Sequence, residues 1–171
     1  DNGAATSAQL YYPYHLTVDS LSNVFIADSN IYRVRKITYS TRIMTTYAGN
    51  GIQSSTGDGG AATSGSIYAP FSAFVNTLNN LFIGEYGGHR IRQVSSSGIL
   101  STIAGTGTQS SSSTANNGDG GPATSATLNN PIGVWCSSSG SIYVADLLNL
   151  RIRLISLSTG LISTIAGTGI A

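Results

Sequence analysis

Short runs of hydrophobic residues alternate with polar positions along this chain, and four such runs recur in a fixed order. They are clearest between residues 132 and 167, where the chain reads IGVWCS, SIYVAD, RIRLIS and LISTIAG. In RIRLI, Arg151 and Arg153 point to one face and Ile152 to the other, which is the two-residue period of a β-strand. Turns rich in serine and glycine separate the runs. The segment therefore predicts four antiparallel strands joined by hairpins.

The second run of each group is almost entirely apolar. VFIA at residues 24–27 and IYVA at residues 142–145 have no polar side of their own. Such runs are typical of strands that are covered on both faces. No segment shows a 3.6-residue period long enough for a helix, so the pattern predicts an all-β protein.

The group of four runs occurs three times, with a period of 57 to 61 residues. When Asp1, Asp58 and Asp119 are aligned, the segments DNGAATSAQLYYP, DGGAATSGSIYAP and DGGPATSATLNNP coincide, and RVRKI, RIRQV and RIRLI coincide further on. Four antiparallel strands repeated at this spacing predict the blades of a β-propeller. The Asp-Gly-Gly segment is interpreted as the linker between blades. The predicted blades, which form one propeller-type domain that is incomplete alone, are residues 1–57, 58–118 and 119–171.

Three blades are too few for a closed ring, because closed propellers have about four to eight. We therefore expect half of a six-bladed ring or a slice of a longer array. A third arrangement is an extended stack or filament in which each chain abuts the next. The expected partners are other copies of the same chain or adjacent propeller blades.

The run IYVADLLNLRIRLI, flanked by GDGGPATSATLNNPIGV and STIAGTG, resembles the NHL repeat of β-propeller proteins. The resemblance covers the whole chain, three times. The Asn-His-Leu-like triplet of the family falls at residues 31–33, 88–90 and 149–151, where only His89 and Asn149 are family-like. The resemblance implies a propeller fold. Some members of the family are lyases with a central zinc held by histidines, and others bind RNA through a basic face.

Charge is scarce in this chain. Only 9% of residues are charged and the formal net charge is +1, against about 25% charged residues in a typical soluble domain. We therefore expect no nucleic-acid partner, with an RNA-binding NHL module as an alternative. No apolar run approaches 18 residues, so we expect no membrane insertion. Few lysines and many small polar residues favour an extracellular or cell-surface location.

Nearly every charged residue stands at a position that the repeat fixes. The acid that ends each second strand lies five residues before an arginine, across a tight turn, where carboxylate and guanidinium can form a bidentate pair. The functional interpretation of these groups is a ring of charges around a central site. We favour a structural clasp in each blade and expect the second arginine of each Arg-x-Arg at a solvated edge or in a groove. The clasp pairs are Asp28 with Arg33, Glu85 with Arg90, and Asp146 with Arg151.

The candidate chemistry is sparse. His15 and His89 occupy non-equivalent positions, whereas a catalytic zinc generally takes three protein ligands. GDGG offers one carboxylate, too few for a calcium loop, and lacks the lysine of a nucleotide-binding loop. Cys136 aligns with valines of the other copies and is interpreted as a small buried hydrophobe. We therefore predict no catalytic residues, no metal and no cofactor, with a propeller lyase or hydrolase completed by missing blades as the alternative.

The copies differ most in aromatic residues near the start of the first strand. LYYPYHL at residues 10–16 stands where the other copies read IYAPFSA and LNNPIGV. This excess predicts a contact patch for a protein or glycan ligand, or a cover for the junction with a neighbouring blade. The favoured function is a non-catalytic scaffold for protein interaction or structural assembly, with a subunit of an extracellular filament as the alternative. The candidate patch residues are Tyr11, Tyr12, Tyr14, His15, Tyr86 and His89.

Overall fold

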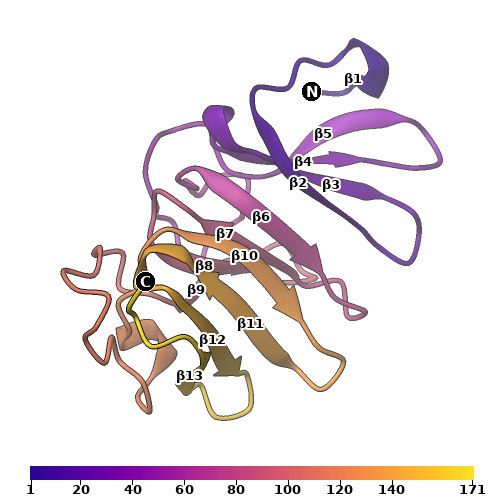
Figure 1. The fold of residues 1–171 in the computed structure, drawn as a ribbon. Coiled ribbons are helices and arrows are strands. Elements are labelled where there is room, and N and C mark those ends of the chain that lie inside the picture. The colour runs from indigo at the N-terminus through magenta and orange to yellow at the C-terminus, as the bar shows by residue number, and fades with distance from the viewer.

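The computed structural model describes residues 1–171 as three antiparallel sheets. The sheets follow one another in chain order like the ribs of a fan (Figure 1). The protein contains no α-helix, only four 3₁₀ turns of three residues each. The predicted all-β fold of three antiparallel blades is confirmed.

Blade 1 is a five-stranded sheet in the order β1-β5-β4-β3-β2. The extra strand, β1, is a two-residue pairing on the outer edge of the blade. The strands are β1 (Gly3–Ala4), β2 (Pro13–Val18), β3 (Val24–Asp28), β4 (Arg33–Ile37) and β5 (Ile43–Ala48).

Blades 2 and 3 have four strands each, in sequential order. Each of the three sheets is built from residues of a single repeat. In blade 2 the strands are β6 (Pro70–Val75), β7 (Leu81–Glu85), β8 (Arg90–Val94) and β9 (Leu100–Ala104). In blade 3 they are β10 (Pro131–Cys136), β11 (Ser141–Asp146), β12 (Arg151–Ser156) and β13 (Ile162–Ala166).

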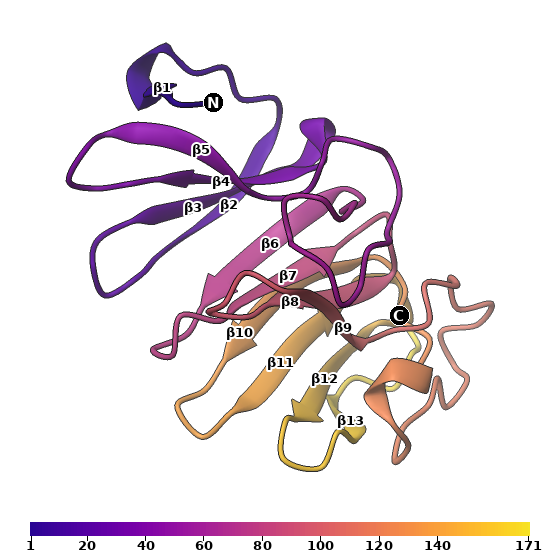
Figure 2. The same cartoon turned by 180° about the vertical axis from the view of Figure 1, so that it is seen from behind.

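Among the first full-length strands of the blades, β6 packs against both β2 and β10. Each begins at a proline, Pro13, Pro70 or Pro131, because the first residue of a strand tolerates the missing N–H. Both connecting segments, residues 49–69 and 105–130, run along the same side of the fan (Figure 2).

The Asp-Gly-Gly segment covers the outer edge of its own blade, in addition to linking it to the previous one. The Gly59 N–H donates to the Leu100 carbonyl at 2.8 Å, and the Ala62 N–H donates to the Gly98 carbonyl at 2.9 Å. These bonds pair backbone groups that an edge strand would otherwise leave open to other chains. The segment is therefore part of the blade, and it positions Asp58 over β8.

Two hydrophobic cores lie between the blades, each formed by 12 buried residues. The core between blades 2 and 3 takes Ile91 and Ala104 from the earlier blade and Leu128 and Val134 from the later one. Burial of a large aliphatic side chain stabilises a protein by about 1.5–3 kcal/mol. The seams between blades thus hold the fan together.

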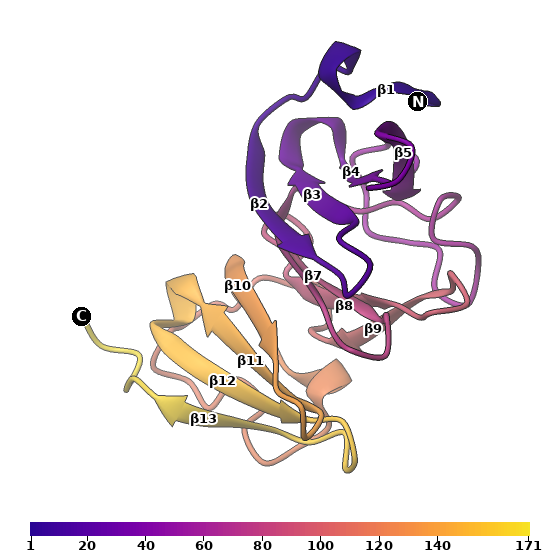
Figure 3. The same cartoon turned by 90° about the vertical axis from the view of Figure 1, so that its right-hand side faces the viewer.

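The outermost faces of the fan lack this cover. Leu10 is 38% exposed, whereas its equivalent in blade 3, Leu128, is 0% exposed. At the other end Ile152 is 39% exposed, whereas its equivalent Ile91 is 0% exposed. Figure 3 shows the N- and C-termini at opposite ends of the fan. Each end therefore presents the kind of face that a neighbouring blade covers inside the structure.

Candidate functional site

A buried ion-pair network occupies the same place in blades 2 and 3. In blade 2 the Arg92 guanidinium contacts the Glu85 carboxylate at 3.2 Å and the Asp58 carboxylate at 2.5 Å. In blade 3 Arg153 contacts Asp146 at 3.1 Å and Asp119 at 2.7 Å. Both arginines are buried. Each joins the acid of the edge-covering segment to the acid at the end of the second strand.

Blade 1 has only half of this network. Arg35 contacts Asp1 at 2.5 Å, but no ion pair joins it to Asp28. Oδ1 of Asp28 accepts the Tyr11 N–H at 2.8 Å, while Oδ2 is buried without a partner. Burial raises the pKa of Asp28, and the Tyr11 N–H and the nearby arginines oppose the rise.

The predicted clasp pairs are wrong, because the first arginine of each Arg-x-Arg motif binds backbone carbonyls instead of the acid. Arg90 donates to the carbonyls of Ser55 at 3.2 Å and Thr106 at 2.8 Å. The strand register does place Glu85 opposite Arg90, but the carboxylate turns toward Arg92. The same correction applies to Asp28 with Arg33 and to Asp146 with Arg151, since Arg33 donates to the Asn50 carbonyl and Arg151 to those of Ser113 and Thr168.

The expectation of a solvated edge or groove for Arg35, Arg92 and Arg153 is also wrong, because all three are buried. The physical reason is that a guanidinium has five N–H donors in a fixed fork, which lets one buried side chain serve two acids. In blades 2 and 3 the first arginine instead joins the segment that enters the blade to the one that leaves it, whereas Arg33 in blade 1 binds only the segment that leaves. Both arginines thus have different partners from those predicted.

Among the acids of these networks, the pKa of Glu85 in blade 2 is shifted far from its ordinary value. Burial raises the pKa of Glu85 to about 7, and Arg92, the Ser55 hydroxyl and the Tyr68 N–H oppose the rise. The Ser55 hydroxyl donates to one carboxylate oxygen and the Tyr68 N–H donates to the other at 3.2 Å. Burial likewise raises the pKa of Asp146.

Above this network, a hollow of about 500 Å³ opens where the three blades converge. It is bounded by the β3–β4 turn, the β7–β8 turn, the starts of β6 and β10, and the two connecting segments. None of its lining residues carries a formal charge with histidine neutral. We call it the mouth hollow, and it is lined by Ser29, Asn30, Tyr32, Gln53, Tyr68, Ala69, Phe71, Tyr86, Gly87, His89, Gln109 and Asn130.

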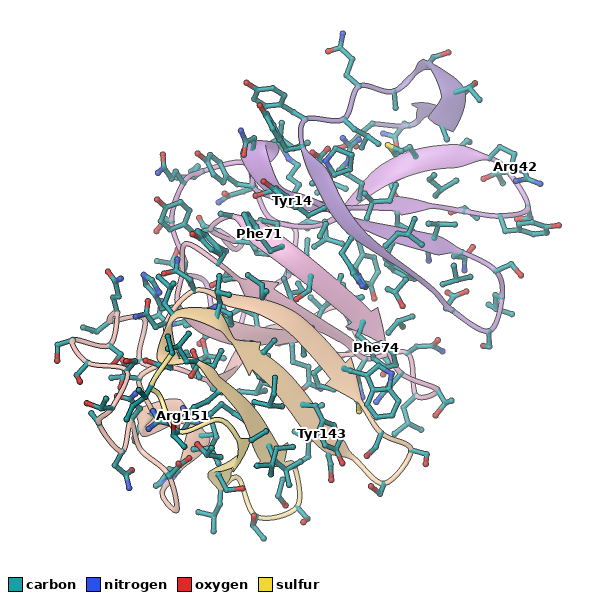
Figure 4. All side chains as sticks on the ribbon, viewed as in Figure 1. Tyr14, Arg42, Phe71, Phe74, Tyr143 and Arg151 are labelled. Atoms are coloured by element: carbon teal, nitrogen blue, oxygen red, sulfur yellow. The ribbon has the colours of Figure 1, made fainter.

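A continuous aromatic stack leads into the mouth hollow. The rings of Tyr14 and Phe71 lie 4.0 Å apart and nearly parallel, and those of Phe71 and Tyr86 lie 4.3 Å apart. Figure 4 shows Tyr14 and Phe71 side by side where blade 1 meets blade 2. Tyr12 continues the row at 6.5 Å from Tyr14, and Tyr11 contacts Tyr12 edge-on at 5.1 Å.

Of the six candidate patch residues, only Tyr86 and His89 line the mouth hollow. Tyr11, Tyr12 and Tyr14 belong to the aromatic row that leads to it. His15 lines a different hollow on the open face of blade 1, which Tyr14 also borders. Sequence reasoning missed Tyr32, Phe71 and Tyr68 as mouth residues. Column-by-column comparison of the copies could have found them, because they align with His89, Tyr14 and Tyr11 respectively.

No cluster of three or more histidine, cysteine, aspartate or glutamate side chains of the kind that holds a metal ion is present. The helical turns include none long and apolar enough to cross a membrane.

Four-stranded antiparallel blades that pack face to face in chain order define a β-propeller. The family model described as the Teneurin NHL domain matches residues 5–156, and the chain belongs to this NHL-repeat family. Mouse Teneurin-1 is 42% identical over 73 residues, and human Teneurin-4 is 42% identical over 72 residues. These matches cover 40% and 39% of this chain and 3% of each relative, so the chain matches a small part of the length of those proteins.

Solved propellers share the fold at low identity. An auxiliary nutrient binding protein from Bacteroides thetaiotaomicron aligns with a TM-score of 0.64 and 18% identity, over 89% of this chain and 37% of that chain. A gluconolactonase from Xanthomonas campestris aligns with a TM-score of 0.62 and 12% identity, over 93% and 48%. A streptogramin B lyase aligns with a TM-score of 0.61 and 14% identity, over 92% and 41%. At these identities the likeness establishes the fold alone.

Proposed function

We propose that this chain is a non-catalytic scaffold module of an extracellular NHL propeller, which joins further blades at its open faces and offers its mouth to a partner. The observation that carries the proposal is the pair of uncovered faces at the ends of the fan. A structural module of this kind needs recognition surfaces rather than reactive groups.

The open face of blade 3 has the shape of a receptor for another blade. It contains a hollow of about 250 Å³ whose lining includes Ala145, Ile152 and Ala166. The equivalents of the last two residues in blade 2, Ile91 and Ala104, belong to the same buried core as Leu128. The occupant that fits this face is therefore the leucine equivalent to Leu128, together with the first strand, of a further NHL-type blade.

The non-catalytic part of the proposal is supported by how the acids are used. Glu85 and Asp146 are held by the second arginine of their own blade in the same arrangement. A reactive group rarely needs an equivalent copy in successive blades, whereas an architectural contact does. The extracellular part is supported by the low charge and the hydroxyl-rich composition.

Light scattering tests the assembly of blades. We expect the purified chain to associate, and a head-to-tail duplicate with six blades to be monomeric with a higher melting temperature. Ile152→Lys on the open face should reduce association. Leu78→Lys is the matched control, because Leu78 is 71% exposed but lies in a hairpin turn.

The proposal is overturned if the three-bladed chain stays monomeric and duplication leaves its melting temperature unchanged. Negative-stain images of the associated material then separate the two modes of assembly. Closed six-bladed rings support the scaffold module, and continuous rods support the filament instead.

A further inference from the structure

We propose that the mouth hollow is a binding site for an uncharged oligosaccharide. This inference rests on the proposed function, because it names the class of ligand that the mouth of the module takes. The observations that carry it are the aromatic walls, the amide groups at the rim, a buried hydroxyl without a partner and the absence of formal charge among the lining residues. The volume of about 500 Å³ is within the range of about 300–1,000 Å³ that is typical of small-ligand sites.

The aromatic walls are held in fixed positions. The ring of Tyr68 lies so close to Gly87 that a Cβ there would stand 2.8 Å from it. Gln53 Nε2 donates to the Tyr68 hydroxyl at 2.8 Å, and the Tyr32 ring meets Tyr68 edge-on at 5.9 Å. Partly exposed tyrosines present an apolar face and a hydroxyl together, which suits the apolar faces and hydroxyl groups of a sugar ring.

His89 supplies a directed donor at the floor of the hollow. Its Nδ1 accepts the Asn130 N–H at 3.1 Å. Burial lowers the pKa of His89, which favours the neutral ring. With Nδ1 occupied as an acceptor, the neutral ring carries its proton on Nε2. Nε2 makes no hydrogen bond within the protein, so its N–H is free for a ligand hydroxyl.

The hollow also holds a polar group that the protein leaves unsatisfied. Ser29 is 1% exposed, lines the hollow, and its hydroxyl has no hydrogen-bond partner. An unpaired buried hydroxyl is destabilising, and a hydrogen bond from a ligand in the hollow would relieve that cost. At the rim, Asn30 and Gln109 add exposed amides that both donate and accept.

The lining selects against other ligands. Phosphates, sulfated glycans and nucleic acids are commonly bound by lysine or arginine, and the lining of the hollow has neither. Arg92, the nearest buried guanidinium in blade 2, is committed to Glu85 and Asp58. A proline-rich peptide docks on aromatic rings, but its prolines lack N–H donors, so it offers fewer hydrogen bonds to the amides of the hollow. Four amides and one imidazole around aromatic rings favour a ligand that is covered with hydroxyl groups.

Saturation-transfer NMR and calorimetry test the proposal on the full chain. The probes are three uncharged oligosaccharides, namely cellotriose, triacetylchitotriose and a β-galactobiose. We expect at least one to bind, with affinity lowered about tenfold by the double variant Asn30→Ala/Gln109→Ala and by His89→Ala. Tyr68→Phe, which keeps the packing but removes the hydroxyl, should weaken binding less than these variants. Tyr39→Ala is the matched control, because Tyr39 is an exposed tyrosine in the β4–β5 hairpin and lies outside the hollow.

Three results overturn the proposal. One is the absence of binding by all three probes at concentrations up to about 10 mM, because a specific site should have a dissociation constant lower than that. Another is binding that all the mouth variants leave unchanged. The third is preferential binding of a heparin tetrasaccharide or a proline-rich decapeptide. Melting curves confirm folding of each variant, and the light-scattering test of blade assembly is independent, so this inference can fail while the proposed scaffold function holds.

Discussion

Glu85 is one methylene longer than Asp28 and Asp146, which hold the equivalent position in the other blades. In blade 3 the triplet residue Asn149 donates to the Asp146 carboxylate at 2.8 Å. In blade 2 a Cβ at Gly88 would collide with the Glu85 carboxylate, so the longer acid fits only because the asparagine is absent. The loss of the triplet residue in blade 2 is thus coupled to the extra length of its acid.

The raised pKa of Glu85 gives a pH dependence with a definite sign. The ordinary value is 4.5 and the folded value is about 7, so between these values the folded state holds a proton that the unfolded state has lost. Stability therefore falls as pH rises from 4.5 through 7. We expect Glu85→Gln, which imitates the protonated acid, to remove this fall in melting curves recorded between pH 5 and 8.

Subtracting the melting profile of Glu85→Gln from that of the unsubstituted chain separates the titration of Glu85 from that of other groups. Burial lowers the pKa of His89, and a group of that kind makes stability rise through pH 6.5, which partly hides the fall in the unsubstituted protein. Parallel melting profiles for the variant and the unsubstituted chain would show that Glu85 does not titrate in this window.

At the scale of elements, each blade depends on one tight turn between its second and third full-length strands. The turn ends in a residue with left-handed backbone, Tyr32, His89 or Leu150, whose φ values are 56°, 50° and 53°. A glycine at the end of the last strand packs directly against this residue. In blade 2 that glycine is Gly105, with a φ of 90°.

Gly105→Ala should destabilise the chain by about 2–4 kcal/mol, which combines the cost of left-handed backbone with that of a steric clash. The clash arises because a Cβ at Gly105 would overlap the His89 carbonyl. Gly98→Ala is the matched control, since φ is 82° there but a Cβ would meet nothing within 4 Å. It should cost only about 1 kcal/mol. Urea unfolding measures both, and equal losses would contradict the role of the turn contact.

The sequence predicts elements better than it predicts side-chain partners. Strand existence and order follow from the threefold repeat, because each copy supplies independent evidence for the same pattern. The pairing of Glu85 with Arg92 rather than Arg90 does not follow, since both arginines share a strand face. Which one is buried depends on the edge-covering segment, whose Asp58 lies 34 positions from Arg92 along the chain. The mouth hollow is likewise invisible locally, because Tyr32, Phe71 and Asn130 come from three different blades.

At the scale of the whole molecule, the two ends of the fan are unlike its middle. At each internal seam the first strand of the later blade packs mainly against the first and second strands of the earlier one. Under the proposed assembly, the outer face of blade 1 and the outer face of blade 3 together form one further seam between copies or blades. The same substitution therefore changes the free energy of unfolding by a different amount in an end blade than in an internal one.

Substituting Leu128 and Leu10 tests this difference directly, since the two residues hold equivalent positions and only Leu128 is fully buried. Leu128→Ala should cost about 2–5 kcal/mol, and Leu10→Ala should cost about 0.5 kcal/mol or less in the dilute, unassociated chain. In the six-bladed duplicate, the second copy of Leu10 faces the uncovered hollow of blade 3. Substitution of this second Leu10 by alanine should then lower the free energy of unfolding as much as Leu128→Ala does, because its side chain is now buried between two blades. If Leu10→Ala costs the same in both proteins by urea unfolding, the two open faces do not form a seam of the internal kind.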